Sequence, residues 1–62
     1  MNGYYRQVTR LLRDAGFNLI RQGKGSHEIW GKGRITLIVP HGCKSRHTAN
    51  AILHDAGLKD RL

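Results

Sequence analysis

The chain of 62 residues carries eleven Lys and Arg against four Asp and Glu, which gives a formal net charge of +7 at pH 7. This length fits one small domain, which we expect to span residues 1–62, and leaves no room for a second. No apolar run approaches the ~20 residues of a membrane helix, the N-terminal stretch lacks the apolar core of a secretory signal, and the single Cys43 cannot form an internal disulfide, so we expect a soluble protein of the reducing cytoplasm without membrane contact.

The first predicted element is an amphipathic helix over residues 4–15. Its apolar residues recur at helical spacing, whereas its arginines stay off the apolar stripe. Asn2 is a candidate N-cap, and Gly16 stands where a left-handed residue commonly ends a helix. The apolar stripe consists of Tyr4, Val8, Leu11, Leu12 and Ala15.

Three short strands follow, at residues 17–22, 26–30 and 34–39, and Pro40 closes the third. Glycine-rich turns at residues 23–25 and 31–33 join them as antiparallel neighbours. In the second strand, alternation places His27 and Ile29 on one face and Glu28 and Trp30 on the other, with Ser26 beside the latter pair. The sequence leaves open which face meets the helices.

The last predicted element is a second helix that Ser45 caps and Gly57 ends. Its apolar residues are Ala49, Ile52, Leu53 and Ala56. Each terminal helix can bury its stripe only against one face of the sheet. The order α-β-β-β-α therefore predicts an α+β two-layer sandwich, with a three-stranded antiparallel sheet and two helices on one face.

The positive charge indicates a polyanionic partner, and nucleic acid is the first candidate. An acidic protein partner is the alternative, and basicity by itself marks many small proteins. The charges are spread along the chain, which argues against a membrane-bound amphipathic helix.

His27 is the candidate catalytic residue because it directly follows a glycine-rich turn that a nucleic acid can reach. RNA supplies its own nucleophile, the 2′-hydroxyl, so a single imidazole with a reference pKa of about 6.5 suffices as acid or base. The sequence does not say which role it takes, and His41, His47 or water remain candidates for the second proton carrier. The alternative is a structural or simply exposed histidine.

Two groups of residues are candidates for binding RNA phosphates. Lys24, Gly25 and Ser26 offer a cation, an open backbone and a hydroxyl beside His27, although this pattern also suits an ordinary hairpin turn. Lys44 and Arg46 precede or begin the second helix, where the helix dipole favours an anion. A solvated basic helix start is the alternative for the second group.

The sequence contains one pattern that could bind metal, H-x-C-x-x-x-H, formed by His41, Cys43 and His47. It lacks paired cysteines and a fourth ligand, so we expect neither a metal nor a small-molecule cofactor. Cys43 is interpreted as a small loop residue, and His54 as a residue on the polar side of the second helix.

Residues 4–58 resemble the HicA toxins of bacterial HicA–HicB toxin–antitoxin modules. The most specific element is the triplet Gly25, Ser26 and His27 between the first two strands. A tight turn at residues 31–33 departs from the longer hairpin of many members, and Cys43 and His47 stand where lysines are common. Supporting residues are Val39, Pro40, His41, Ile52, Leu53, Ala56, Gly57 and Leu58.

The resemblance implies a fold like a double-stranded-RNA-binding domain and a ribosome-independent endoribonuclease that inhibits translation by cleaving mRNA. It also implies that His27 is catalytic and that a HicB antitoxin covers this histidine. Our own reasoning adds that cleavage is metal-independent. Two other functions remain open: a non-catalytic double-stranded RNA-binding module, and a protein-interaction unit whose basic surface meets an acidic partner.

Overall fold

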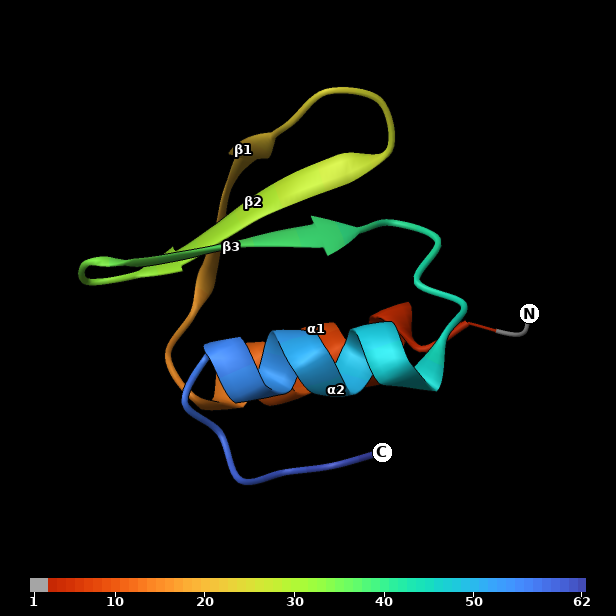
Figure 1. The fold of residues 1–62 in the computed structure, drawn as a ribbon. Coiled ribbons are helices and arrows are strands. Elements are labelled where there is room, and N and C mark those ends of the chain that lie inside the picture. Colours follow the sequence, from red (N-terminus) through yellow and green to blue (C-terminus); the bar gives the residue numbers. More distant parts are fainter. Residues whose placement is uncertain (1–2) are drawn as a thin grey trace.

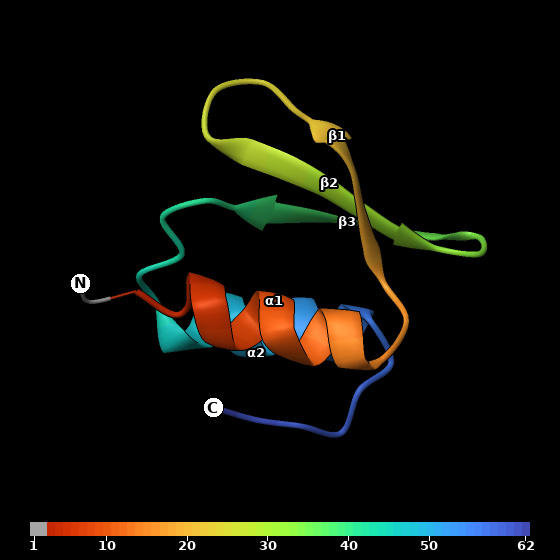
Figure 2. The ribbon, with the colours of Figure 1, turned by 180° about the vertical axis from the view of Figure 1, so that it is seen from behind.

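The computed structural model describes residues 3–62 and confirms the predicted α-β-β-β-α order. The strands form one antiparallel sheet in the order β1-β2-β3, and both helices lie on the same side of it (Figures 1 and 2). This two-layer arrangement is compatible with a fold like a double-stranded-RNA-binding domain. The elements are α1 (Tyr5–Asp14), β1 (Asn18–Gln22), β2 (His27–Lys32), β3 (Ile35–Pro40) and α2 (Arg46–Asp55).

Helix α1 follows the predicted apolar stripe. Its N-cap is Tyr4, which makes no side-chain capping hydrogen bond, and the predicted cap Asn2 lies outside the described residues. Gly16 has φ of 99° and ends the helix as expected, because glycine enters this left-handed region without steric cost.

The predicted ends of helix α2 are also confirmed. The Ser45 hydroxyl accepts a hydrogen bond from the Thr48 backbone N–H at 3.4 Å, and Gly57 follows the helix with φ of 80°. Neither α2 nor any other helix within residues 3–62 is long and apolar enough to cross a bilayer.

The second hairpin is tighter than predicted. Strand β2 continues through Lys32, which pairs with Ile35, so the turn consists of Gly33 and Arg34 rather than residues 31–33. Gly33 has φ of 59°, as the first position of such a two-residue turn can require. The Lys32 ammonium donates a hydrogen bond of 2.6 Å to the Ala15 carbonyl oxygen at the C-terminal end of α1. The helix dipole favours a cation at this end.

Strand β1 contains an irregularity that the sequence did not predict. The register shifts between Leu19, which pairs with Trp30, and Arg21, which pairs with Ile29. Ile20 is therefore an extra residue in this edge strand, as in a β-bulge.

The structure answers which face of β2 meets the helices. Trp30 is fully buried and Glu28 is 5% exposed, whereas His27 is exposed on the opposite face, called the open face below. Two residues of the predicted α1 stripe, Val8 and Leu12, are fully buried, whereas the other three are half-buried: Tyr4, Leu11 and Ala15. The core consists of Val8, Leu12, Phe17, Trp30, Leu37, Val39, Cys43, Ala49, Ile52, Leu53 and Ala56.

Candidate active site

His27 is the first residue of β2, and its backbone is held by the β1–β2 loop. Its N–H donates to the Lys24 carbonyl oxygen at 3.2 Å, and its own carbonyl oxygen accepts from the Gly23 N–H at 2.7 Å. The Gln22 side-chain amide donates to the same carbonyl at 3.2 Å. The side chain is exposed, so a ligand approaching the loop reaches the imidazole directly.

The imidazole of His27 has one defined contact, in which Nδ1 lies 3.2 Å from the Lys24 carbonyl oxygen. A carbonyl oxygen only accepts, so this contact is a hydrogen bond only when Nδ1 carries the proton. In the neutral ring the free lone pair is then on Nε2. In that tautomer, Nε2 is the nitrogen that can take a proton from a substrate.

The loop residues predicted to bind phosphate lie together with His27. Lys24, Gly25 and Ser26 are all exposed, and Gly25 has φ of 63° with open space where a Cβ would stand. The Ser26 carbonyl oxygen accepts a hydrogen bond of 2.7 Å from the His41 N–H, which fastens this loop to the segment after β3. Ser26 itself belongs to the loop, because β2 begins one residue later than predicted.

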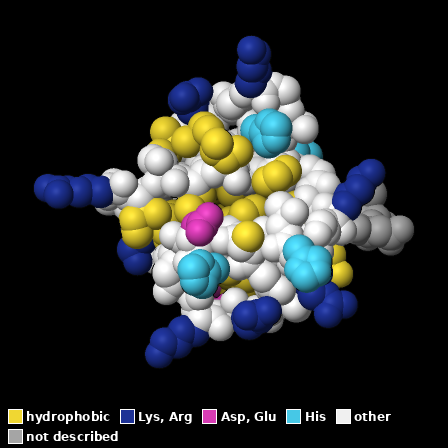
Figure 3. All heavy atoms as spheres, in the orientation of Figure 1, with side chains coloured by type: hydrophobic (Ala, Val, Ile, Leu, Met, Phe, Trp, Pro, Cys, Tyr) yellow, Lys and Arg dark blue, Asp and Glu magenta, His cyan; other side chains and the backbone are white. Residues whose placement is uncertain are grey.

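The second predicted phosphate group lies at the same end of the molecule. Lys44 and Arg46 are exposed at the start of α2. Figures 1 and 2 both show the β1–β2 loop and the start of α2 at one end, in the sheet layer and the helix layer respectively. Figure 3 shows Lys and Arg side chains projecting around the outline of the molecule with little acidic surface between them.

A buried carboxylate behind His27 was not recognised from the sequence. Glu28 Oε1 accepts hydrogen bonds from the Tyr5 hydroxyl at 2.7 Å and from Trp30 Nε1 at 3.0 Å. Burial opposes ionisation of Glu28, but the two hydrogen bonds, with the charges of His41 and Arg13, outweigh it and hold its pKa below the usual value.

The partner hydroxyl of this pair is shifted in the opposite direction. Burial, together with the hydrogen bond to Glu28 and its negative charge, raises the pKa of Tyr5 to about 12. The Tyr5 ring also packs against the His41 ring, with centroids 4.7 Å apart. The spacing of Glu28 and Trp30 was the sequence signal for this contact, because alternation along β2 places both side chains on the same face of the sheet.

The possible metal ligands do not form a cluster. Within residues 3–62, no three His, Cys, Asp or Glu side chains are grouped so that they could hold a metal ion. Cys43 is a loop residue as predicted, but it belongs to the core, with 2% of its surface exposed. Burial raises the pKa of its thiol, whose Sγ lies 3.8 Å from the Ser45 carbonyl oxygen.

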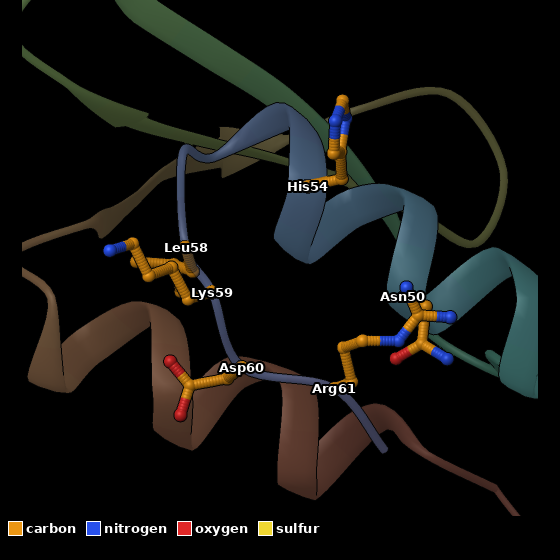
Figure 4. Close-up of a pocket in the computed structure, with 6 residues that line it drawn as sticks. All are labelled: Asn50, His54, Leu58, Lys59, Asp60 and Arg61. Carbon is orange, nitrogen blue, oxygen red and sulfur yellow. The ribbon is translucent and has the colours of Figure 1, made fainter.

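An open hollow lies on the helix layer, beside the C-terminal segment (Figure 4). The segment is held there by Asn50, which exchanges two hydrogen bonds with the Leu62 backbone. Figure 1 shows this segment on the side of the helices away from the sheet, so the hollow is not part of the His27 site. Its lining residues are Asn50, His54, Leu58, Lys59, Asp60 and Arg61.

The fold, the basic end and the exposed histidine describe a small basic α+β domain, and a family comparison identifies its class. The model of a family described as HicA toxin of bacterial toxin-antitoxin matches residues 5–58. The chain therefore belongs to the HicA toxin family, and a toxin role within a toxin–antitoxin pair follows. Comparisons with curated proteins and with solved structures gave no match.

Proposed function

We propose that this toxin is a ribosome-independent, metal-independent endoribonuclease that cleaves mRNA in the cytoplasm and is neutralised by a HicB antitoxin. The observation that carries the proposal is the imidazole of His27. It is exposed, its Nδ1 lies 3.2 Å from the Lys24 carbonyl oxygen, and it directly follows the glycine-containing β1–β2 loop. A net charge of +7 supports an RNA substrate.

In the proposed reaction, Nε2 of His27 takes the proton from a ribose 2′-hydroxyl. The 2′-oxygen forms a bond to the adjacent phosphorus, the bond from phosphorus to the 5′-oxygen breaks, and the leaving oxygen takes a proton from water. The products are a 2′,3′-cyclic phosphate and a free 5′-hydroxyl. His41 and His47, which are both exposed, are the alternative donors of this second proton.

The cationic residues supply binding and charge stabilisation in this reaction. In this proposal Lys24, Gly25 and Ser26, which border His27, hold the scissile phosphate, and their cation and N–H groups stabilise the developing negative charge. Lys44 and Arg46 lie at the same end of the molecule, and we assign them to a neighbouring phosphate.

The test is incubation of the purified protein with end-labelled single-stranded RNA in excess EDTA, beside His27→Ala. The matched control is His54→Ala, because the His54 side chain is 90% exposed on α2, away from the β1–β2 loop. We expect cleavage by the wild type and by His54→Ala, and none by His27→Ala. Equal cleavage by all three proteins would show that His27 is not a catalytic residue.

A non-catalytic double-stranded RNA-binding module is the second candidate, favoured by the α-β-β-β-α architecture. It predicts tight, salt-dependent binding of duplex RNA that remains intact, and binding that is unchanged in His27→Ala. Binding without cleavage by wild type would therefore favour this module over the nuclease.

A further inference from the structure

The backbone of His27 depends on its two neighbours for its attachment to the rest of the fold. Its own N–H and carbonyl oxygen form hydrogen bonds within the exposed β1–β2 loop. Its pairing partner on β3 is Pro40, which has no N–H to donate. The orientation of the imidazole relative to the sheet therefore depends on what holds Ser26 and Glu28.

Both neighbours of His27 are fastened to other parts of the molecule. The Ser26 carbonyl oxygen accepts a hydrogen bond of 2.7 Å from the His41 N–H, in the segment after β3. On the other side, the buried Glu28 carboxylate accepts hydrogen bonds from the Tyr5 hydroxyl at 2.7 Å and from Trp30 Nε1 at 3.0 Å. Successive side chains of a strand project from opposite faces, so fixing Glu28 on the helix side fixes the direction in which His27 projects from the open face.

A single side chain of α1 reaches both of these attachments. The Tyr5 hydroxyl donates to Glu28, and the Tyr5 ring packs against the His41 ring, with centroids 4.7 Å apart. Tyr5 is the first residue of α1, in the layer that lies below the sheet in Figures 1 and 2. One residue of the helix layer thus braces β2 directly after His27 and also the segment that holds Ser26.

Stability alone does not explain a buried carboxylate in this position. Removing a carboxylate from water is costly, and well-packed apolar side chains of similar volume often stabilise a core as well or better. Apolar contacts are not directional, whereas a hydrogen bond weakens steeply when its length or angle changes. The donors of Tyr5 and Trp30 therefore define the position of Glu28, and with it the start of β2, more narrowly than an apolar contact would.

Proton transfer by His27 is sensitive to this kind of placement. A general base must lie within hydrogen-bond reach of the proton that it takes, and a misplacement of about 1 Å can lower a rate by roughly a hundredfold. The imidazole side chain itself has one defined contact, at the Lys24 carbonyl oxygen. The remaining precision has to come from the backbone that carries the side chain.

We propose that Tyr5 and Glu28 are positioning residues for His27. By fixing the start of β2 and the segment around His41, they keep the imidazole in the orientation in which Nδ1 faces the Lys24 carbonyl oxygen. They act through the backbone and not by touching RNA. The kinetic consequence rests on the proposed function of His27, whereas the orientation of the ring does not.

The test compares Tyr5→Phe, which removes the hydrogen bond and keeps the ring, with Leu11→Ala. Leu11 is the matched control because it belongs to the same helix but lines a surface hollow beside Leu62, so its truncation weakens α1 elsewhere. Glu28→Gln is the conservative variant, since its amide oxygen can accept the same two hydrogen bonds.

Two readouts are taken at a temperature at which every variant is folded. The first is the kcat and KM for RNA cleavage in EDTA. The second is the pair of ring-nitrogen NMR signals of His27 in the protein without RNA, at a pH at which the ring is neutral, assigned by their loss in His27→Ala. These signals report which ring nitrogen carries the proton.

We expect Tyr5→Phe to lower kcat by about tenfold or more, with KM near wild type because the exposed phosphate-binding residues are unchanged. The two ring-nitrogen signals of His27 should move toward each other as the preference for a proton on Nδ1 is lost. Glu28→Gln should keep most of the activity. Leu11→Ala should keep the wild-type kcat and the wild-type signals.

Two results would overturn the positioning role. One is a wild-type kcat with unchanged His27 signals in Tyr5→Phe. The other is an equal loss of kcat in Leu11→Ala, which would show that only the stability of α1 matters.

The positioning role and the nuclease function fail separately in this experiment. If the wild type cleaves no RNA, the nuclease function is wrong, and the His27 signals in Tyr5→Phe still decide the positioning role. If the wild type cleaves RNA but Tyr5→Phe changes neither kcat nor the signals, the nuclease function stands and the positioning role is wrong.

Discussion

The Tyr5 hydroxyl donates a hydrogen bond of 2.7 Å to the Glu28 carboxylate and thereby connects helix α1 to the strand that begins with His27. Trp30 supplies the second donor to the same oxygen. A carboxylate that is 5% exposed would be costly without these donors. The pair therefore stabilises the contact between the two layers directly behind the candidate active site.

Tyr5→Phe removes one donor and leaves the buried Glu28 carboxylate less satisfied. We expect it to lower the free energy of unfolding by about 1.5–3 kcal/mol at neutral pH, the range for hydrogen bonds to charged groups. The folded pKa of Glu28 is lowered, so its contribution is present above the unfolded pKa and is lost as pH falls through the folded value.

Urea unfolding of wild type and Tyr5→Phe at neutral pH and at about pH 3 measures this contribution. The difference between the two proteins should shrink at the lower pH. Tyr4→Phe is the matched control, since Tyr4 is the neighbouring phenol and is not a partner of Glu28. An equal difference at both pH values would show that the Glu28 charge is not involved.

Leu12 and Leu11 are neighbours in α1 but differ in burial. Leu12 is fully buried and Leu11 is half-buried, although the sequence placed both on the apolar stripe. We expect Leu12→Ala to cost about 2–5 kcal/mol and Leu11→Ala clearly less. Thermal or chemical unfolding measures both, and an equal loss would contradict the observed packing of α1.

Lys24→Ala tests the phosphate-binding role of the β1–β2 loop. We expect weaker RNA binding at every salt concentration. The slope of log affinity against log salt concentration should fall by roughly one, because one phosphate contact is lost. Lys59→Ala, which removes a cation from the C-terminal segment, is the matched control. A loss of affinity as large in Lys59→Ala would indicate only a general effect of net charge.

The ends of the cleaved RNA test the proposed chemistry. Attack by the 2′-hydroxyl leaves a 2′,3′-cyclic phosphate and a 5′-hydroxyl, so a kinase should label the new 5′ ends without prior phosphatase treatment. A substrate with 2′-deoxyribose at the cleavage position should resist the enzyme. A 5′-phosphate on the product would rule out this mechanism.

Several features follow from the sequence because their causes are local. Gly16 and Gly57 end helices through their tolerance of left-handed backbone, and Ser45 caps α2 through its own hydroxyl. The loop containing Lys24 comes directly before His27 in the chain, so their association needed no tertiary information. The same holds for the element order, which hydrophobic periodicity determines.

Tertiary packing decided which face of the sheet is buried. Alternation along a strand separates two sets of side chains but does not say which set meets the helices. Only the helices beneath β2 determine that Glu28 and Trp30 are buried while His27 is exposed. The bulge at Ile20 depends on pairing with β2, and no local pattern specifies a register shift.

The sequence by itself determined the α-β-β-β-α order, the caps and the place of the histidine after its glycine loop, since each depends on neighbouring residues. The tertiary structure alone decided the hydrogen bonds of Glu28 and the position of Ile20 over Gly31 on the open face. Both require side chains that are distant in the chain to meet across the sheet, and such contacts depend on pairing and layering rather than on local propensity.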